Sequence, residues 1–316
     1  MKKKYIFVLL LLISITVVSS VSTFFYVKLN NDQNAGGDDI LVMTSCNPVY
    51  IATLNVLDGV PGYKVENLSQ PTTGCLHDYT LTTEDMKNLS KADVLVVNGG
   101  GMEGYLEDVE AAYPELKIID TYEILEHQGS LPLEGKGDHE VVDEVDHEDQ
   151  EEHHHDHGAN SHIWMDDELF KYQVKAIAEG LSVSQDNMRI FTAKLENDID
   201  KQGLDKTLAG ANVAVLHEAF EYTAQSLGAN VVATMDLDEE RQVSAGEVSD
   251  FINEIKEHDV KLVLAEYDYG NAMGKLIEEQ TDAKVVYLET LVHGNYDKDS
   301  YVTVMNNNYK LIKTSL

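Results

Sequence analysis

The stretch Val213-Ala214-Val215-Leu216-His217-Glu218-Ala219-Phe220 joins a short apolar run to a histidine and then to a helical spacer. The run lacks strict alternation of apolar and polar residues, as expected for a strand that is buried on both faces of a parallel sheet. With this run included, short apolar runs of the same kind occur at Ile40–Thr44, Lys64–Asn67, Val94–Asn98, Lys117–Asp120, Val213–Leu216, Asn230–Thr234, Leu262–Ala265 and Lys284–Leu288. Strands that alternate with helices in two sets of four predict an α/β fold of two lobes, each a four-stranded parallel sheet flanked by helices.

The segment between the two sets of strands is long, polar and free of proline. Gly180 and Leu181–Asp186 divide it into two helices, and we expect the second to run from Asp186 to about Leu208. This one long helix would join the lobes and limit hinge opening. The predicted domains are therefore an N-terminal lobe at 40–165, linking helices at 166–209 and a C-terminal lobe at 210–316.

The N-terminus predicts export from the cytoplasm. Three lysines follow Met1, and the chain is then uncharged from Tyr5 to Val27. A basic start before an apolar run is typical of a signal or membrane anchor, here residues 1–29, and 30–39 would form a flexible tether. An uncleaved anchor places the protein on the extracellular face of a Gram-positive-type membrane. A cleaved signal makes it secreted or periplasmic, and the sequence leaves both alternatives open.

Charge narrows the possible partners. The 316 residues include 23 Lys and Arg against 56 Asp and Glu, a net charge of -33. Such a surface repels phosphate backbones and anionic lipid headgroups, which excludes nucleic-acid binding and favours cations.

Residues 128–160 form an insert that is rich in acidic residues and histidines and cannot build a core. We expect a disordered loop whose imidazoles bind metal weakly, although a simple solvated acidic insert is the alternative. These accessory histidines are His139, His147, His153, His154, His155 and His157.

Three further histidines lie where ligands bind in open α/β sheets. His77 follows the second strand, His162 precedes a helix, and His217 follows the fifth strand. Each alone is more often a structural histidine, but three at equivalent sheet edges predict a metal site. Glu289 and Glu266 each follow a strand of the second lobe directly, and position alone does not choose between them as a fourth ligand.

Three motifs, in this order, resemble one known family. They are Leu76-His77-Asp78-Tyr79 with Thr82–Asp85, Ser161-His162-Ile163-Trp164-Met165-Asp166, and His217-Glu218-Ala219-Phe220. They resemble the zinc-specific substrate-binding proteins of ABC importers, the ZnuA-like cluster A-I group, which is related to the manganese-binding TroA and PsaA proteins. The resemblance implies a monomer of two α/β lobes bridged by a long helix, which captures Zn²⁺ and delivers it to the transmembrane subunits of an ABC permease.

The resemblance also bears on the ligand set. In related proteins the fourth ligand is an Asp or Glu ahead of a C-terminal Ser-Tyr segment, and counting back from Ser300-Tyr301 favours Glu289 over Glu266. Three imidazoles and one carboxylate suit Zn²⁺, whereas Mn²⁺ prefers oxygen-rich shells.

Two features depart from the family pattern. No cysteine near the N-terminus can carry a lipid anchor, and Cys46 and Cys75 both follow strands of the first lobe. In an oxidising compartment we expect a Cys46–Cys75 disulfide. Two separate thiols, or Cys75 as a metal ligand, are the alternatives.

Two other functions compete with transport. A zinc hydrolase could use Glu218 or Glu266 as general base, but the sequence has no HExxH motif and a site with four protein ligands is closed to water. We therefore predict that the protein is not an enzyme. Extracellular exposure would also allow a surface adhesin of the same fold.

Overall fold

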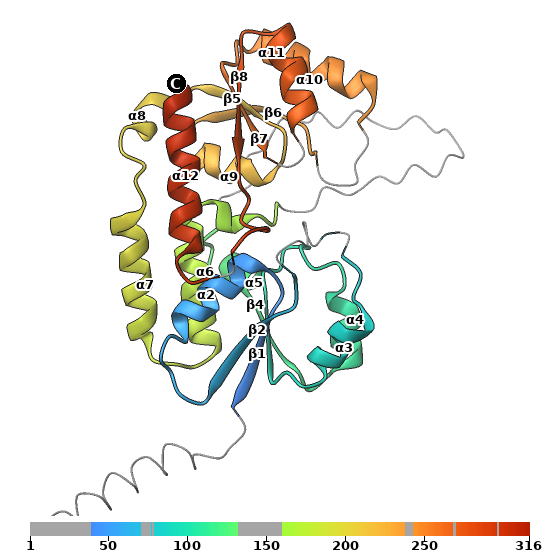
Figure 1. The fold of residues 1–316 in the computed structure, drawn as a ribbon, viewed down its shortest axis with the longest axis vertical. Helices are drawn as coiled ribbons and strands as arrows, with labels where there is room; N and C mark the ends of the chain where they lie inside the picture. The colour runs from blue at the N-terminus through green and yellow to red at the C-terminus, as the bar shows by residue number, and fades with distance from the viewer. Residues whose placement is uncertain are drawn as a thin grey trace, which may run out of the picture. The chain divides into compact units, whose positions relative to one another are not determined.

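Two parallel sheets form the framework of the protein (Figure 1). The computed structural model describes residues 39–70, 77, 79–131, 160–237, 243–267, 270–295 and 297–316. The first sheet has the order β2-β1-β3-β4, with β1 at Ile40–Thr44, β2 at Tyr63–Asn67, β3 at Val94–Val97 and β4 at Lys117–Asp120. The second has the order β6-β5-β7-β8, with β5 at Asn212–Val215, β6 at Asn230–Thr234, β7 at Leu262–Glu266 and β8 at Lys284–Leu288. The predicted α/β class, with four parallel strands in each half, is confirmed.

Helices follow the strands as the sequence indicates. In the first half these are α2 at Asn47–Val56, α3 at Thr83–Leu89, α4 at Leu106–Ala112 and α5 at Thr121–His127. In the second half they are α9 at Ala219–Ser226, α10 at Ala245–Glu257, α11 at Asn271–Gln280 and α12 at Ser300–Ser315. Thr82 with Asp85, and Ser244 with Glu247, form capping boxes at the starts of α3 and α10, because each pair satisfies two otherwise unbonded amides.

One hydrophobic core lies between the two sheets. Alternate strand residues such as Val96 and Val215 belong to a single buried cluster that includes side chains of α2, α6, α9 and α12. The opposite strand faces form two separate clusters, in which Leu95 packs with α3 and α4, and Val263 packs with α10 and α11. Because the two lobes share their largest core, separating them would expose apolar surface.

The linking segment differs from the prediction at its C-terminal end. It begins with a 3-10 turn, η1, at Ile163–Met165, and continues as α6 at Asp167–Gly180, α7 at Gln185–Asp198 and α8 at Leu204–Leu208. The helix expected from Asp186 to about Leu208 therefore ends at Asp198. Ile199 is extended and Gly203 adopts φ +88°, a left-handed conformation that interrupts a helix.

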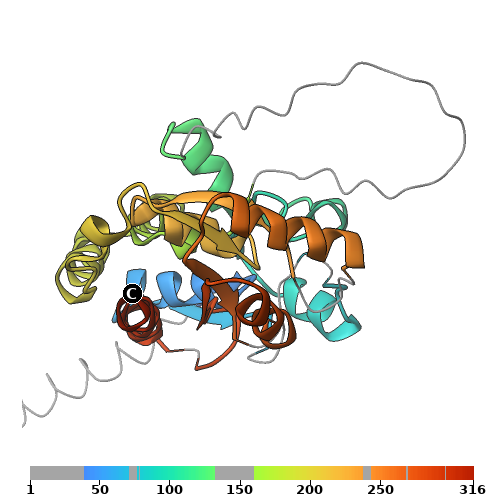
Figure 2. The same cartoon turned by 90° about the horizontal axis from the view of Figure 1, so that it is seen from above.

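The C-terminal helix α12 forms a second connection between the lobes. It lies beside α7 and close to α2 in both views (Figures 1 and 2). Lys194 of α7 pairs with Asp299, and the Asn306 amide donates to the Asp198 carbonyl at 2.8 Å. Near α2, the ammonium of Lys298 pairs with Asp58 at 2.8 Å. The lobes are thus tied at two places along the chain.

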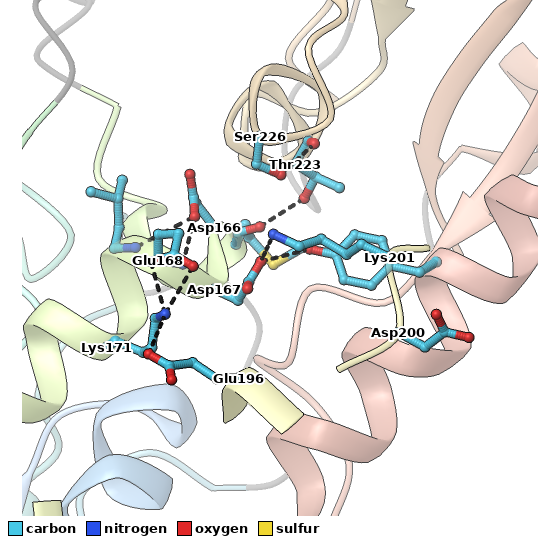
Figure 3. A network of polar contacts seen from close by, with 12 residues as sticks. Asp166, Asp167, Glu168, Lys171, Glu196, Asp200, Lys201, Thr223 and Ser226 are labelled. Atoms are coloured by element: carbon cyan, nitrogen blue, oxygen red, sulfur yellow. Dashed lines mark hydrogen bonds and ion pairs between the residues drawn. The ribbon is translucent and has the colours of Figure 1, made fainter. Parts of the chain in front are cut away.

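A polar network fixes the start of α6 (Figure 3). Asp166 caps the helix by accepting from two backbone amides of its first turn. The next residue, Asp167, is buried and accepts from the Lys201 ammonium at 2.6 Å and from the Tyr309 hydroxyl at 3.1 Å. Elements from the linker and from α12 therefore converge just after the Ser161–Asp166 motif.

Several predicted features lie outside the described residues. These are the anchor 1–29, the tether apart from Asp39, most of the insert 128–160, and Cys75. Among the helices that the structure describes, none is long and apolar enough to cross a membrane. Cys46 is a buried free cysteine among the described residues. Because Cys75 is not among them, the Cys46–Cys75 disulfide stays a prediction.

Candidate metal centre

Three histidines that are far apart in the sequence lie together at the edges of the two sheets. The ring centroids of His77 and His162 are 5.5 Å apart, and those of His162 and His217 are 4.9 Å apart. His217 comes just after β5, and His162 immediately precedes the η1 turn. His162 and His217 are buried, whereas His77 is exposed. The structure thus brings together the three histidines that the sequence singles out.

His217 is held by a buried carboxylate. Its Nδ1 lies 2.8 Å from Oε2 of Glu266, the last residue of β7, and the Thr290 hydroxyl donates to Oε1 at 2.6 Å. Burial disfavours the charged form of both His217 and Glu266. The hydrogen bond between the two side chains and the attraction between their opposite charges outweigh this effect. The pKa of His217 is therefore raised and the pKa of Glu266 is lowered. A proton held on Nδ1 leaves the Nε2 lone pair as the metal-binding atom.

His162 is oriented by two oxygens. Its Nδ1 lies 3.2 Å from Oδ1 of Asn160 and 3.3 Å from Oε1 of Glu218. Burial, followed by the neighbouring imidazoles of His217 and His77, holds the pKa of His162 well below its ordinary value. This ring is therefore neutral at physiological pH, which is the form that binds metal.

Two carboxylates that the sequence did not predict as part of the metal site act on the histidines. Ligand atoms of His77, His162 and Glu218 all lie within 4.8 Å of one another, although the sequence suggested Glu218 only as the base of a rival hydrolase. The charge of a second carboxylate, Asp236, acts to raise the pKa of both His162 and His217. The position of Glu218 directly after His217 was the one available signal.

The structure treats the two predicted fourth ligands differently. Glu266 is buried and bonded to His217, whereas Glu289 has an exposed side chain. The backbone of Glu289 makes two hydrogen bonds with the side chain of Asn308. Its N–H donates to Asn308 Oδ1 at 3.0 Å, and its carbonyl accepts from Asn308 Nδ2 at 2.8 Å. Glu289 follows β8, the strand paired with β7, so both carboxylates belong to the same edge of the second sheet.

A buried turn supports the first-lobe histidines. Glu103 accepts from the backbone amides of Asn98 and Gly99 at 2.9 Å each, and from the Ser45 hydroxyl at 2.6 Å. Burial raises the pKa of this carboxyl to about 7. The side-chain amide of Asn98 donates to the Ser161 carbonyl at 2.7 Å. The residue before His162 is therefore anchored to the end of β3.

The backbone just after this turn packs closely against the backbone of His77. A Cβ atom added to Gly104 would lie 2.9 Å from the His77 carbonyl oxygen, closer than real Cβ contacts allow. No side chain fits there unless the His77 backbone moves.

Comparisons with known proteins show the family of this chain. Residues 42–315 match the ZnuA family model, described as zinc-uptake complex component A periplasmic. The zinc-binding protein AdcA of Streptococcus pyogenes serotype M6 is 25% identical over 319 residues, which cover 94% of this chain and 60% of the relative. The chain thus spans about 60% of the length of these AdcA relatives. The high-affinity zinc uptake system protein ZnuA of Yersinia pestis is 26% identical over 287 residues, covering 84% of this chain and 87% of the relative.

Solved structures share the fold. FpvC of Pseudomonas aeruginosa in complex with Ni²⁺ has a TM-score of 0.69 at 20% identity, covering 87% of this chain and 96% of that chain. Zn(II)-bound AdcA of Streptococcus pneumoniae has a TM-score of 0.65 at 19% identity, covering 88% of this chain and 57% of that chain. With a family match that extends from the first strand almost to the C-terminus, this chain belongs to the ZnuA family.

Proposed function

We propose that this protein is an extracytoplasmic solute-binding protein that captures Zn²⁺ between its lobes and delivers it to an ABC permease. The observation that carries the proposal is the convergence of His77, His162 and His217 from three distant stretches of chain. The zinc-binding relatives and the periplasmic description of the family support it. Residues 1–29, as signal or anchor, and 30–39, as tether, would hold the lobes outside the cytoplasm.

Zinc fits the donor set. Zn²⁺ accepts imidazole nitrogen and carboxylate oxygen in a tetrahedral site. The three histidines would bind it, with the Nδ1 atoms of His162 and His217 already directed at carboxylates. Carboxylates that hold the second nitrogen of a ligating histidine are a general feature of zinc sites.

For the fourth ligand we propose Glu289. Glu266 and Glu218 each contact the Nδ1 of one histidine, a role that orients a ligand rather than binds the ion. Glu289 is exposed and follows the strand next to β7. This leaves its carboxylate to approach an ion held by the imidazoles.

Two lobes, 40–165 and 210–316, would supply ligands from both sides. Because one core and the α12 contacts already tie the lobes, we propose that zinc moves them only slightly. A small movement of His77 and Glu289 would account for most of the change that a permease recognises.

The insert 128–160 would serve as a zinc collector. Its six histidines, His139, His147, His153, His154, His155 and His157, lie among carboxylates that attract cations. Weak sites that exchange quickly would raise the local zinc concentration near the tight site.

The ligand assignment can be tested with Trp164, the single tryptophan of the chain, whose ring centroid lies 5.1 Å from that of His162. Zinc titrations followed by its fluorescence should show a loss of affinity of more than about 100-fold for His77→Ala, His162→Ala, His217→Ala and Glu289→Gln. Glu266→Gln and Glu218→Gln should cost about 10–100-fold, because these residues act through a ligand.

The exposed His127→Ala serves as a control and should leave zinc affinity unchanged. Wild-type affinity in Glu289→Gln, together with the larger loss in Glu218→Gln, would transfer the fourth position to Glu218.

Zinc binding should also depend on pH through His217. Only the neutral imidazole binds metal, and Glu266 raises the pKa of His217, so affinity should begin to fall above the ordinary value of about 6.5 as the solution is acidified. Glu266→Gln removes the charge that favours the imidazolium, which should shift this fall to lower pH. Dissociation constants measured between about pH 5 and about pH 8 check this.

A matched control is Glu254→Gln, which breaks the surface pair of Glu254 with His258. The hypothesis fails if Glu254→Gln and Glu266→Gln give the same pH profile.

Gly104 lies close to the His77 carbonyl, so a side chain at this position should disturb His77. Gly104→Ala should displace the His77 backbone and weaken zinc binding about tenfold, equivalent to about 1.4 kcal/mol. In a His77→Ala background the same substitution should cause no further loss, because its effect passes through His77. Gly246→Ala, where the nearest atom lies 3.7 Å away, is the control. Equal losses in both backgrounds would show that Gly104 does not act through His77.

Deletion of Glu134–His157 tests the role of the insert. The tight site should keep its affinity, while weak zinc binding disappears and capture slows when zinc is scarce. Equilibrium dialysis gives the stoichiometry, and stopped-flow Trp164 fluorescence gives the rate. Replacing only the six insert histidines by asparagine should have the same effect at full length. Disappearance of the tight site in either variant would refute the proposed division of labour.

A further inference from the structure

We propose that Thr290 is a positioning residue that ties the second-lobe ligand His217 to the first-lobe ligand His162. This inference rests on the proposed function, since it concerns how the zinc ligands are held. Thr290 lies two residues beyond β8 and contacts both lobes through different atoms, its hydroxyl on one side and its carbonyl on the other.

On the second-lobe side, Thr290 completes the support of His217. Its hydroxyl donates to Oε1 of Glu266 at 2.6 Å, while Oε2 of the same carboxylate contacts His217 Nδ1 at 2.8 Å. Thr290 is 2% exposed, and Glu266 and His217 are each 4% exposed, so water does not replace a lost partner readily. Bonds at both oxygens restrict rotation of the carboxylate, and this fixes the direction of the imidazole.

On the first-lobe side, the Thr290 carbonyl accepts from the indole nitrogen of Trp164 at 2.8 Å. Trp164 is buried and follows His162 by two residues, and the two rings are in contact. The bond therefore joins the His162 motif to the segment that carries Glu289.

The next peptide group is held in the same way. The Asn47 amide, at the start of α2, donates to the Leu291 carbonyl at 2.6 Å. Leu291 adopts φ +69°, a conformation that is uncommon for a branched side chain and persists where surrounding contacts determine it. Two first-lobe donors thus define the path of the chain at Thr290 and Leu291.

The consequence is a continuous chain of contacts from one lobe to the other. It runs from His162 through Trp164, Thr290 and Glu266 to His217. Removing the Thr290 hydroxyl leaves the Trp164 bond in place but frees one oxygen of Glu266. His217 should then lose its fixed orientation while the fold is retained.

The test compares Thr290→Val, which keeps the shape but removes the hydroxyl, with Thr290→Ser, which keeps the hydroxyl. In the full chain, chelator competition should show zinc affinity lowered about 10–100-fold by Thr290→Val and restored by Thr290→Ser. The visible absorption of Co²⁺-loaded protein, which reports coordination geometry, should change in the valine variant and return in the serine variant. Thermal unfolding of the metal-free proteins measures stability separately. Thr290→Ala removes the same hydroxyl and takes the place of the valine variant should that not fold.

A second arm repeats Thr290→Val in a Glu266→Gln background, where no further loss is expected because the hydroxyl acts through that carboxylate. Wild-type affinity and spectrum in Thr290→Val would overturn the inference, as would equal losses in the valine and serine variants or full additivity with Glu266→Gln. The wild-type titration is read first, and absence of tight zinc binding there would overturn the proposed function itself.

Discussion

Three imidazoles can face one another only if the edges of two separate sheets are held together, and the core between those sheets imposes this constraint. Parallel strands end at the same edge, so His217 and Glu266 meet because β5 and β7 are neighbours. Bringing His162 to them requires in addition that the linker and the second lobe pack on one apolar cluster. Burial of this cluster supplies a driving force that scales with its area, and no single polar contact could replace it.

The polar residues around the histidines offset the free-energy cost of burying charged groups. A buried carboxylate such as Glu266 is costly unless it is hydrogen bonded and paired. Its contacts with His217 and Thr290 meet this need and at the same time fix the imidazole. Burial, followed by two neighbouring imidazoles, lowers the pKa of His162, whereas at His217 the hydrogen bond and charge of Glu266 outweigh burial and raise the pKa. On acidification, His217 should therefore take up a proton before His162 does.

Much of the fold followed from patterns within the sequence. The eight apolar runs became strands of the two sheets, with boundaries shifted by at most one residue. Such patterns are local, because burial on both faces leaves marks on neighbouring residues. The linking helix was predicted less well. Where it ends, the backbone groups of Asp198 and Asp200 bond to the side chain of Asn306, far along the chain, and no local pattern records these contacts.

The candidate site likewise has a part that the sequence predicts and a part that only the structure reveals. The sequence by itself singled out the three histidines, since strand-end positions on an acidic chain are visible in the order of residues. Only the tertiary structure decided which groups support them, because Thr290, Glu103, Gly104 and Trp164 act through contacts that cross from one element to another. Glu218 and Asp236 likewise acquire their place near the imidazoles from the way the second lobe packs against the linker. Residue order records which chemistry is present along a chain, whereas distances between segments arise from the packing of one shared core.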